Sequence, residues 1–226
     1  DTPLDDPSAG AEVADGFISL REAIQAANTN LSFGDAPAGD GGGMLDQITF
    51  AQSLAGQTIV LGGVELTVSD HLSISGPGAD LLTISGNQAS GVFSIAAGVT
   101  VDVSDLTIAD GNAVYGGGAY GGGGIYNEGR LTVENSTFTN NSVTNYGYGG
   151  AICNYSTDSE FVPSTTVVNS LFTGNTAERG WGGAIANVNK ENATHSGTLT
   201  IIGSTFSENS ASSSGGAIYH WSANYP

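Results

Sequence analysis

The stretch STFTNNS at residues 136–142 recurs as SLFTGNT at residues 170–176 and as STFSENS at residues 204–210. These repeats separate Phe138, Phe172 and Phe206 by a constant 34 residues. Within each stretch apolar and small polar residues alternate, which is typical of a strand with one buried face. A constant period of this length indicates a solenoid, in which each coil places the same kind of side chain above the one before it.

Two further apolar columns keep the same period and order. They are Val133, Val167 and Ile201 at 34 residues, and Ile152, Ile185 and Ile218 at 33 residues. The pattern therefore predicts an all-β fold, a parallel β-helix over residues 46–226 with about five coils of three short strands each. Two less regular coils precede the clear repeats. We expect Leu66–Val68 and Leu72–Ile74 to occupy the first two strands of the earliest coil, because Ile74 and Ile108 are again 34 residues apart.

Asparagine recurs at the corners of the predicted coils. Asn141, Asn175 and Asn209 follow the phenylalanine column at the 34-residue period. Asn127, Asn154 and Asn187 form a second series, and His220 occupies its next position. Stacked amides at a strand-to-turn corner can hydrogen-bond to one another and to the turn backbone. We therefore expect structural ladders here, and not ligand sites.

The N-terminal part of the chain lacks the repeat. Residues 1–16 form an acidic extension, and residues 17–45 hold a predicted capping helix and a glycine-rich linker. Ser19 and Glu22 form an S-x-x-E capping box, and Asn28 is a plausible end of the helix. One face of this helix would be apolar, with Leu20, Ala23, Ile24 and Ala27. We expect it to cover the open end of the first coil, with Arg21 and Glu22 in surface and capping roles.

Residues 18–28, ISLREAIQAAN, resemble the CSLREA motif that opens many bacterial secreted β-helix proteins. Those proteins are similar to pectate-lyase-like right-handed parallel β-helices and to the repeat regions of polymorphic outer-membrane proteins and adhesins. The DQITF string at residues 46–50 and the recurring GGAI strings match the same style. The resemblance covers nearly the whole chain and implies a right-handed β-helix in an extracellular or cell-surface setting. It implies no activity, and Ile18 stands where the motif has cysteine.

The charge excludes some partners. The chain has 22 Asp and Glu against 4 Lys and Arg, a net charge of −18, which argues against binding the phosphate backbone of nucleic acids. Binding an acidic polysaccharide would need a bridging divalent cation. Calcium fits that role, but no motif indicates it, and no cofactor is expected.

Cys153 has no disulfide partner in the chain and is expected to be a small packed residue. No apolar run reaches the roughly 18 residues of a membrane span, so we expect no segment that spans a membrane. The few lysines and many Asp, Asn, Thr and Ser suit a secreted surface, and with the resemblance they lead us to expect a secreted or surface protein.

Catalysis in a β-helix glycosidase or lyase needs carboxylates clustered on one face. Asp102, Asp105 and Asp110 lie close in sequence, but Glu134 in the next coil aligns with Val168 and Ile202. The histidines, at positions 71, 195 and 220, lack zinc-site spacing. We therefore expect a non-catalytic structural or adhesive protein. A carbohydrate-active β-helix, either a polysaccharide lyase or a glycoside hydrolase, and a glycan-binding module remain the alternatives.

Aromatic residues in glycine-rich loops are the candidate contact sites. A first set should stack into a ridge along the rod: Tyr115, Tyr120, Tyr146, Tyr148 and Trp181. A second set follows the third strand of each coil: Tyr126, Tyr155, Tyr219 and Trp221. Exposed aromatic rings can stack on sugars or pack against another protein. Packing within the molecule is the competing interpretation.

Five N-x-[S/T] sequons occur, at Asn30, Asn135, Asn140, Asn154 and Asn192. We expect most of them to be products of the Asn-rich repeat, and Asn192 and Asn30 to be the candidate glycosylation sites. The expected partners are surface glycans or further copies of the chain. In the second case the last coil, which has no evident cap, would receive the next subunit head-to-tail, and residues 1–16 would supply an edge strand.

Overall fold

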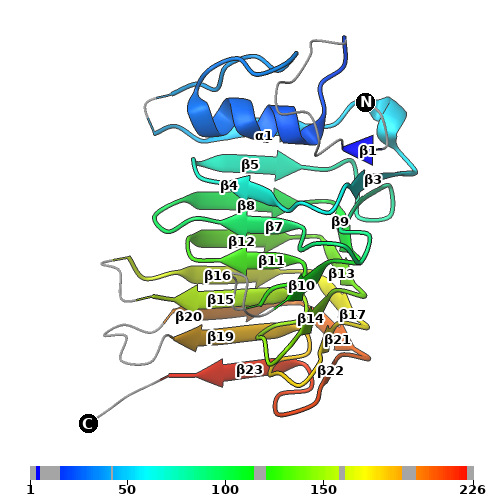
Figure 1. Ribbon diagram of the computed structural model, residues 1–226, viewed down its shortest axis with the longest axis vertical. Helices are drawn as coiled ribbons and strands as arrows, with labels where there is room; N and C mark the ends of the chain where they lie inside the picture. Colours follow the sequence, from blue (N-terminus) through cyan, green and yellow to red (C-terminus); the bar gives the residue numbers. More distant parts are fainter. Residues whose placement is uncertain are drawn as a thin grey trace.

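The computed structural model describes residues 4–5, 16–41, 43–114, 121–157, 161–189 and 197–222. These residues form a parallel β-helix with one α-helix, α1 (Leu20–Thr29), across its N-terminal end (Figure 1). Every pairing between the strands is parallel, as the repeat predicts, and the coils stack along the long axis of the molecule. Among the described residues a new coil begins at residues 46, 72, 100, 130, 164 and 198; the first two coils have three strands each and the other four have four.

The described strands form four sheets, numbered here in the order in which the chain passes through a coil. Sheet 1 contains β2 (Asp46–Thr49), β5 (Leu72–Ser75), β8 (Thr100–Ser104), β12 (Arg130–Glu134), β16 (Ser164–Val168) and β20 (Thr198–Ile202). Sheet 2 contains β1 (Leu4–Asp5), β3 (Gln57–Leu61), β6 (Leu82–Ser85), β9 (Thr107–Ala109), β13 (Thr137–Thr139), β17 (Leu171–Thr173) and β21 (Thr205–Ser207). Sheet 3 contains β10 (Asn112–Val114), β14 (Ser142–Thr144), β18 (Thr176–Ala177) and β22 (Ser210–Ala211). Sheet 4 contains β4 (Leu66–Val68), β7 (Phe93–Ile95), β11 (Ile125–Asn127), β15 (Ile152–Ser156), β19 (Ile185–Asn189) and β23 (Ile218–Trp221). A short 3₁₀ helix, η1 (Gln52–Leu54), joins β2 to β3.

The three apolar columns are confirmed by the strand register. Val133 pairs with Val167 and then Ile201 in sheet 1. Phe138 pairs with Phe172 and then Phe206 in sheet 2, and Ile152 with Ile185 and then Ile218 in sheet 4. The phenylalanine rings are stacked, with centroids 4.8 and 4.9 Å apart and interplanar angles of 6° and 10°. The first two members of each column are buried in the main core, and Ile201 and Phe206 pack against it. Ile218, in the last coil, keeps 39% of its surface exposed.

The register of the N-terminal coils differs from the prediction. Leu66–Val68 lies in sheet 4 and pairs with Phe93–Ile95, while Leu72–Ser75 lies in sheet 1. Ile74 therefore pairs with Val103, and the partner of Ile108 is Ile84. The spacing of 34 residues between Ile74 and Ile108 is a coincidence, because the early coils are shorter: Ile84 and Ile108 are only 24 residues apart.

Sheet 3 is a fourth side of the coil that the three-strand interpretation did not include. Its strands are two or three residues long and follow the asparagine corner directly. Ala113, Val143 and Ala177 form a small buried cluster on this side. A strand this short contains only one inward-facing residue, so it leaves no alternating pattern in the sequence.

From β8 onward, a left-handed residue begins each turn from sheet 1 to sheet 2 and each turn from sheet 2 to sheet 3. Between sheets 1 and 2 these residues are Asp105, Asn135, Asn169 and Gly203, with φ from 48° to 63°. Between sheets 2 and 3 they are Asp110, Asn140, Gly174 and Glu208, with φ from 52° to 67°. Asn, Asp and Gly enter this region most readily. The Asn- and Asp-rich corners of the sequence therefore have a backbone cause.

The first asparagine ladder lies at the second position of the turn from sheet 2 to sheet 3. Asn141 Nδ2 donates to Asn175 Oδ1 at 3.1 Å, and Asn175 Nδ2 donates to Asn209 Oδ1 at 2.9 Å. The same Nδ2 atoms also donate to backbone carbonyls of the preceding coil, those of Ile108 and Phe138. Asn141 and Asn175 are fully buried. Each buried amide thus has the partners that burial requires, and the predicted structural ladder is confirmed.

The second ladder runs through sheet 4. Asn127 Nδ2 donates to Asn154 Oδ1 at 2.8 Å, and Asn154 Nδ2 donates to Asn187 Oδ1 at 2.6 Å. Asn187 Nδ2 lies 2.9 Å from His220 Nδ1 and also donates to the Gly197 carbonyl. Because an amide nitrogen only donates, His220 accepts through Nδ1 and carries its proton on Nε2. His220 therefore continues the ladder, as its position in the sequence predicts.

The capping box of α1 is formed as predicted. Ser19 Oγ accepts from the Glu22 backbone N–H at 3.1 Å, and Glu22 Oε2 accepts from the Ser19 N–H at 2.7 Å. Leu20 and Ile24 are buried in the main core. Glu22 is itself buried, with 4% of its surface exposed, and its Oε1 accepts from the Asp35 N–H. It therefore supports the following loop as well as the cap, and the prediction of a surface role for it is wrong.

Side chains of α1 also hydrogen-bond along the edge of the first turn. Asn28 Nδ2 donates to the Thr67 carbonyl, and Asn28 Oδ1 accepts from the Ser69 N–H, both at 2.8 Å. Arg21 donates to the Val64 and Glu65 carbonyls at 2.7 and 3.2 Å. Since β4 is the edge strand of sheet 4, these contacts occupy backbone groups that an open edge would leave unpaired. The helix therefore caps both the core and the sheet edge.

The N-terminal extension contributes one short strand. In β1, Leu4 pairs with Val60 and Asp5 pairs with Leu61 of β3. The pairing is within the chain, at the N-terminal edge of sheet 2. In the part of the segment that the structure describes, β1 covers an edge of its own chain. Donation of a strand from residues 1–16 to another copy stays a prediction.

Candidate functional site: an aromatic column and the cluster beneath it

Tyr148, Trp181 and Tyr219 form an aromatic column beside sheet 4. Tyr148 and Trp181 are in register through isolated parallel bridges, so that Trp181 follows Tyr148 one coil later. Their rings are stacked, with centroids 5.1 Å apart and an interplanar angle of 21°. The Trp181 and Tyr219 rings are 6.2 Å apart and tilted by 35°. Tyr148 and Trp181, both from the predicted ridge, stack along the rod as expected, and the third member comes from the second predicted set.

The stacking limits what the aromatic column can bind. A sugar ring stacks on the face of an aromatic ring, but the facing surfaces of Tyr148 and Trp181 contact each other. All three members of the column are half-buried. Packing within the molecule therefore accounts for most of the column. Tyr146 and Trp221 offer more accessible rings, with 58% and 37% of their surfaces exposed.

Beneath the column lies the outer cluster, which consists of Tyr126, Cys153, Tyr155, Ala186 and Val188. Because neighbouring residues of a strand point to opposite faces, and Ile152 and Asn154 point into the coil, Cys153 points outward. Tyr148 and Tyr219 pack against the cluster. Tyr126 and Tyr155 are buried, so their predicted availability to a partner is wrong.

Burial sets the chemistry of the outer cluster. The Tyr126 hydroxyl donates to Glu128 Oε1 at 3.1 Å. Burial, together with the nearby Cys153 and Glu128, raises the pKa of the Tyr126 phenol. Burial and then the charge of Glu128 raise the pKa of the Cys153 thiol. A thiol that stays protonated is a poor nucleophile, so Cys153 is a packing residue, as the sequence predicts.

We expect native protein at neutral pH to leave Cys153 unmodified by iodoacetamide, because the thiol is fully buried and its pKa is raised. The same reagent should modify the single cysteine rapidly in 6 M guanidinium chloride, roughly the strength that unfolds even stable domains. Intact-mass spectrometry measures both reactions. Rapid labelling of the native protein would mean that the outer cluster opens readily.

Other predicted site residues fall in different surroundings. Asn30 is half-buried: its Nδ2 donates to Asp70 Oδ2, and its Oδ1 accepts from the Gly41 N–H, both at 2.8 Å. A glycan on Asn30 would displace these hydrogen bonds. Three predicted positions lie outside the described residues, and they are Tyr115, Tyr120 and Asn192.

The outward carboxylates of sheet 1 do not face each other in the strand register. Asp102 pairs with Ser73 on one side and Thr132 on the other. Glu134 pairs with Ser104 and Val168. Over the described ranges, no three His, Cys, Asp or Glu side chains are grouped closely enough to hold a metal ion. In that same part of the chain no helix has the length and apolar character to cross a membrane.

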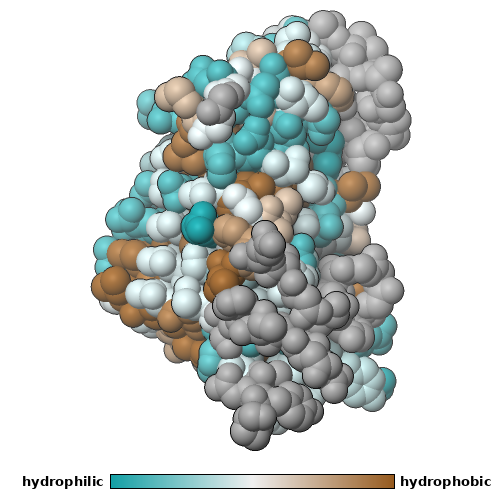
Figure 2. All heavy atoms as spheres, turned by 90° about the vertical axis from the view of Figure 1, so that its left-hand side faces the viewer, coloured by the Kyte–Doolittle hydropathy of each residue, from teal (hydrophilic) through white to brown (hydrophobic). Residues whose placement is uncertain are grey.

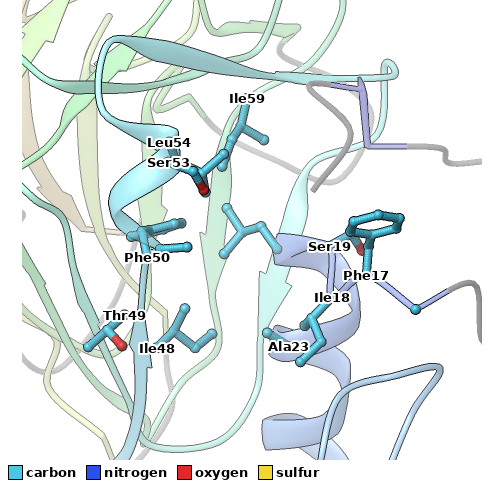
Figure 3. A pocket seen from close by; sticks show the side chains of 13 residues that line it. Phe17, Ile18, Ser19, Ala23, Ile48, Thr49, Phe50, Ser53, Leu54 and Ile59 are labelled. Carbon is cyan, nitrogen blue, oxygen red and sulfur yellow. The ribbon is translucent and has the colours of Figure 1, made fainter.

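A groove of about 480 Å³ lies between α1 and the first turn. In Figure 3, Ile48, Phe50 and Ile59 face Ile18 and Ala23 across it. An α-helix with its side chains is only about 10–12 Å wide, so one helix leaves part of the broader core end uncovered. The sequence did not indicate this groove, because its lining comes from residues far apart in the chain.

The surface around the fold is mixed in character. Figure 2 shows one side of the molecule, on which hydrophobic residues form separate patches among hydrophilic ones wherever the atoms are coloured. Scattered apolar side chains of this kind are normal for a protein surface.

Three segments of the chain match the Chlamydia polymorphic membrane protein repeat. They are residues 135–155, 169–188 and 203–220, together 59 of the 226 residues. Each segment begins at the turn after sheet 1 and continues through sheets 2 and 3 into sheet 4. Comparison with curated proteins and with solved structures finds no match. The similarity thus lies in the three coils whose period is most regular.

Proposed function

We propose that the protein is a non-catalytic structural or adhesive module, held at a cell surface or in the extracellular matrix. The observation that carries the proposal is the match of three successive coils to a repeat of polymorphic membrane proteins. Those coils contain the stacked phenylalanines and both asparagine ladders. Such repetition suits a rigid spacer, since each coil contacts mainly its neighbours along the rod.

The charge and the side chains support the same proposal. A net charge of −18 favours a soluble exterior that repels other acidic surfaces. Contact with a partner would then use uncharged side chains, and Tyr146 and Trp221 are the exposed aromatic candidates. Surface glycans and other proteins both fit these side chains.

Assembly of the protein with itself would meet an obstacle at the N-terminal end. There α1 covers the core and hydrogen-bonds along the edge of β4. Continuous stacking of coils from one copy to the next would require this helix to move away. Head-to-tail filaments therefore need either displacement of α1 or a contact through its outer surface.

The experiment has two arms, catalysis and shape. Purified protein is incubated with polygalacturonate and with xylan, with and without calcium, and new reducing ends are measured. We expect no product, and a monomeric rod by negative-stain microscopy. Product formation that disappears in Asp102→Asn or Glu134→Gln would overturn the proposal in favour of a carbohydrate-active enzyme. Thr132→Asn, on the same face of sheet 1, is the matched control variant.

A further inference from the structure

We propose that Asn135 and Asn140 are acceptor sites for N-linked glycans, chosen among the sequons that lie in the described residues. Asn135 opens the sequon Asn135-Ser136-Thr137, and Asn140 opens the sequon Asn140-Asn141-Ser142. Both asparagines are exposed and lie in left-handed turn positions, with φ of 49° and 55°. The two turns flank the three-residue strand β13. The structure therefore presents both acceptor amides at the outer corners of a single coil.

Accessibility separates these two sequons from others in the described chain. Asn154 is fully buried, and its amide joins Thr165 to Asn187 within the ladder of sheet 4. Asn30 is half-buried and hydrogen-bonded through both ends of its amide. A glycan on Asn154 would not fit inside the coil unless the strands around the ladder of sheet 4 separated. The choice of Asn135 and Asn140 thus differs from the choice that the sequence favours.

The turn conformation alone does not require these sequons. The position of Asn135 is filled by Asp105, Asn169 and Gly203 in neighbouring coils, and Asn169 is followed two residues later by Leu171. The position of Asn140 is filled by Asp110, Gly174 and Glu208. Only the coil that starts at β12 combines Asn with a hydroxyl residue at both corners among these aligned turns. The turns can therefore form without an asparagine and without a hydroxyl residue two positions later, so the backbone conformation does not explain the paired sequons.

The hydroxyl residue of each sequon is partly exposed, and the Ser142 hydroxyl oxygen also lies 3.4 Å from the Gly111 carbonyl and from Asn112 Oδ1. Thr137 and Ser142 are half-buried, and each begins a short strand directly after its turn. Thr137 pairs with Thr107 and Leu171 in sheet 2 and points outward, because Phe138 points into the core. A transferase could therefore contact the amide and the hydroxyl from the same side of the coil.

The modification is a glycosyl transfer from an activated donor, such as a nucleoside diphosphate sugar. The Asn Nδ2–C1 bond forms while the C1–O bond to the donor phosphate breaks. The nucleoside diphosphate leaves, and the amide loses one proton to a base of the transferase. No oxidant or reductant takes part.

Glycans at these corners would lie beside strands whose outward side chains are uncharged, although aligned corners of neighbouring coils carry Asp105, Asp110 and Glu208. The outward positions of sheet 2 near β13 are Thr107, Ala109, Thr137, Thr139, Leu171, Thr173, Thr205 and Ser207. In Figure 1, β13, β17 and β21 lie at the right of the rod, while β15, β19 and β23 cross its front. Glycans beside β13 would therefore hydrate sheet 2 and leave the side of sheet 4, with the exposed Trp221, uncovered.

The test treats purified native protein with a soluble N-glycosyltransferase and UDP-glucose and maps hexose by peptide mass spectrometry. We expect one hexose each at Asn135 and Asn140, and none at Asn154. After unfolding, the Asn154 peptide should be modified as well, which shows that folding, and not sequence, protects it. Native protein left unmodified at both Asn135 and Asn140, with the unfolded chain modified there, would overturn the proposal.

Two kinds of variant assign the sites. Asn135→Asp and Asn140→Asp remove the acceptor amide but keep a residue type that fills the same turns at Asp105 and Asp110. Each should lose hexose at its own position only, with an unchanged melting curve. Thr137→Ala should abolish hexose at Asn135 and leave Asn140 modified. Hexose retained at Asn135 in Thr137→Ala would contradict recognition of the sequon.

Discussion

Replacing Phe172 with alanine will lower the free energy of unfolding by about 3–5 kcal/mol, the range found for buried phenylalanines. The ring is fully buried and stacks on Phe138 on one side and on Phe206 on the other. Alanine leaves a cavity that neighbouring coils cannot fill, because each coil is held in register by strand pairing on four sides. Urea denaturation followed by circular dichroism measures the change.

The matched control is Leu171→Ala, in the same strand. Leu171 points outward and keeps 37% of its surface exposed, so its removal should change the free energy of unfolding by less than about 1 kcal/mol. Equal effects of the two substitutions would show that the interior of the coil is not where the register places it.

The coils with a constant period could be predicted residue by residue. From Val133 onward, the number of residues between equivalent strands of a sheet is constant. Residues that lie one period apart in the sequence therefore pair with each other in neighbouring coils. The same logic failed near Leu66 and Leu72 because the early coils are shorter. A fixed period assigned these strands to the wrong sheets. Local alternation of apolar residues identified the strands themselves correctly.

The candidate site could be predicted only in part. The spacing of Tyr148 and Trp181 indicates stacking, and the structure confirms it. The burial of Tyr126 and Tyr155 was not predictable, because alternation places both on the outer face of sheet 4. What covers an outer face depends on the path of loops, and no periodic pattern encodes that path. For the same reason, the exposure of Asn135 and Asn140 became apparent only with the turns in place.

The cap is the second point at which one substitution should have a large effect. Ile24→Asp should lower the free energy of unfolding at pH 7 by roughly 3 kcal/mol or more, since it places a carboxylate in the apolar core end without a partner. Ile24 is 2% exposed and packs in the main core cluster. Gln25→Asp, the next residue of the helix and half-buried, is the matched control and should have a much smaller effect.

The pH dependence separates buried charge from lost volume. Burial should raise the folded-state pKa of an aspartate at position 24 above its unfolded value near 3.9. Folded protein then favours the protonated form, so the loss of stability should be smallest below about pH 4 and grow as the pH rises toward the folded-state pKa. Ile24→Ala removes similar volume without a charge, so its loss relative to the parent should not vary with pH. An Ile24→Asp variant that unfolds like the parent at pH 7 would show that α1 does not cap the core.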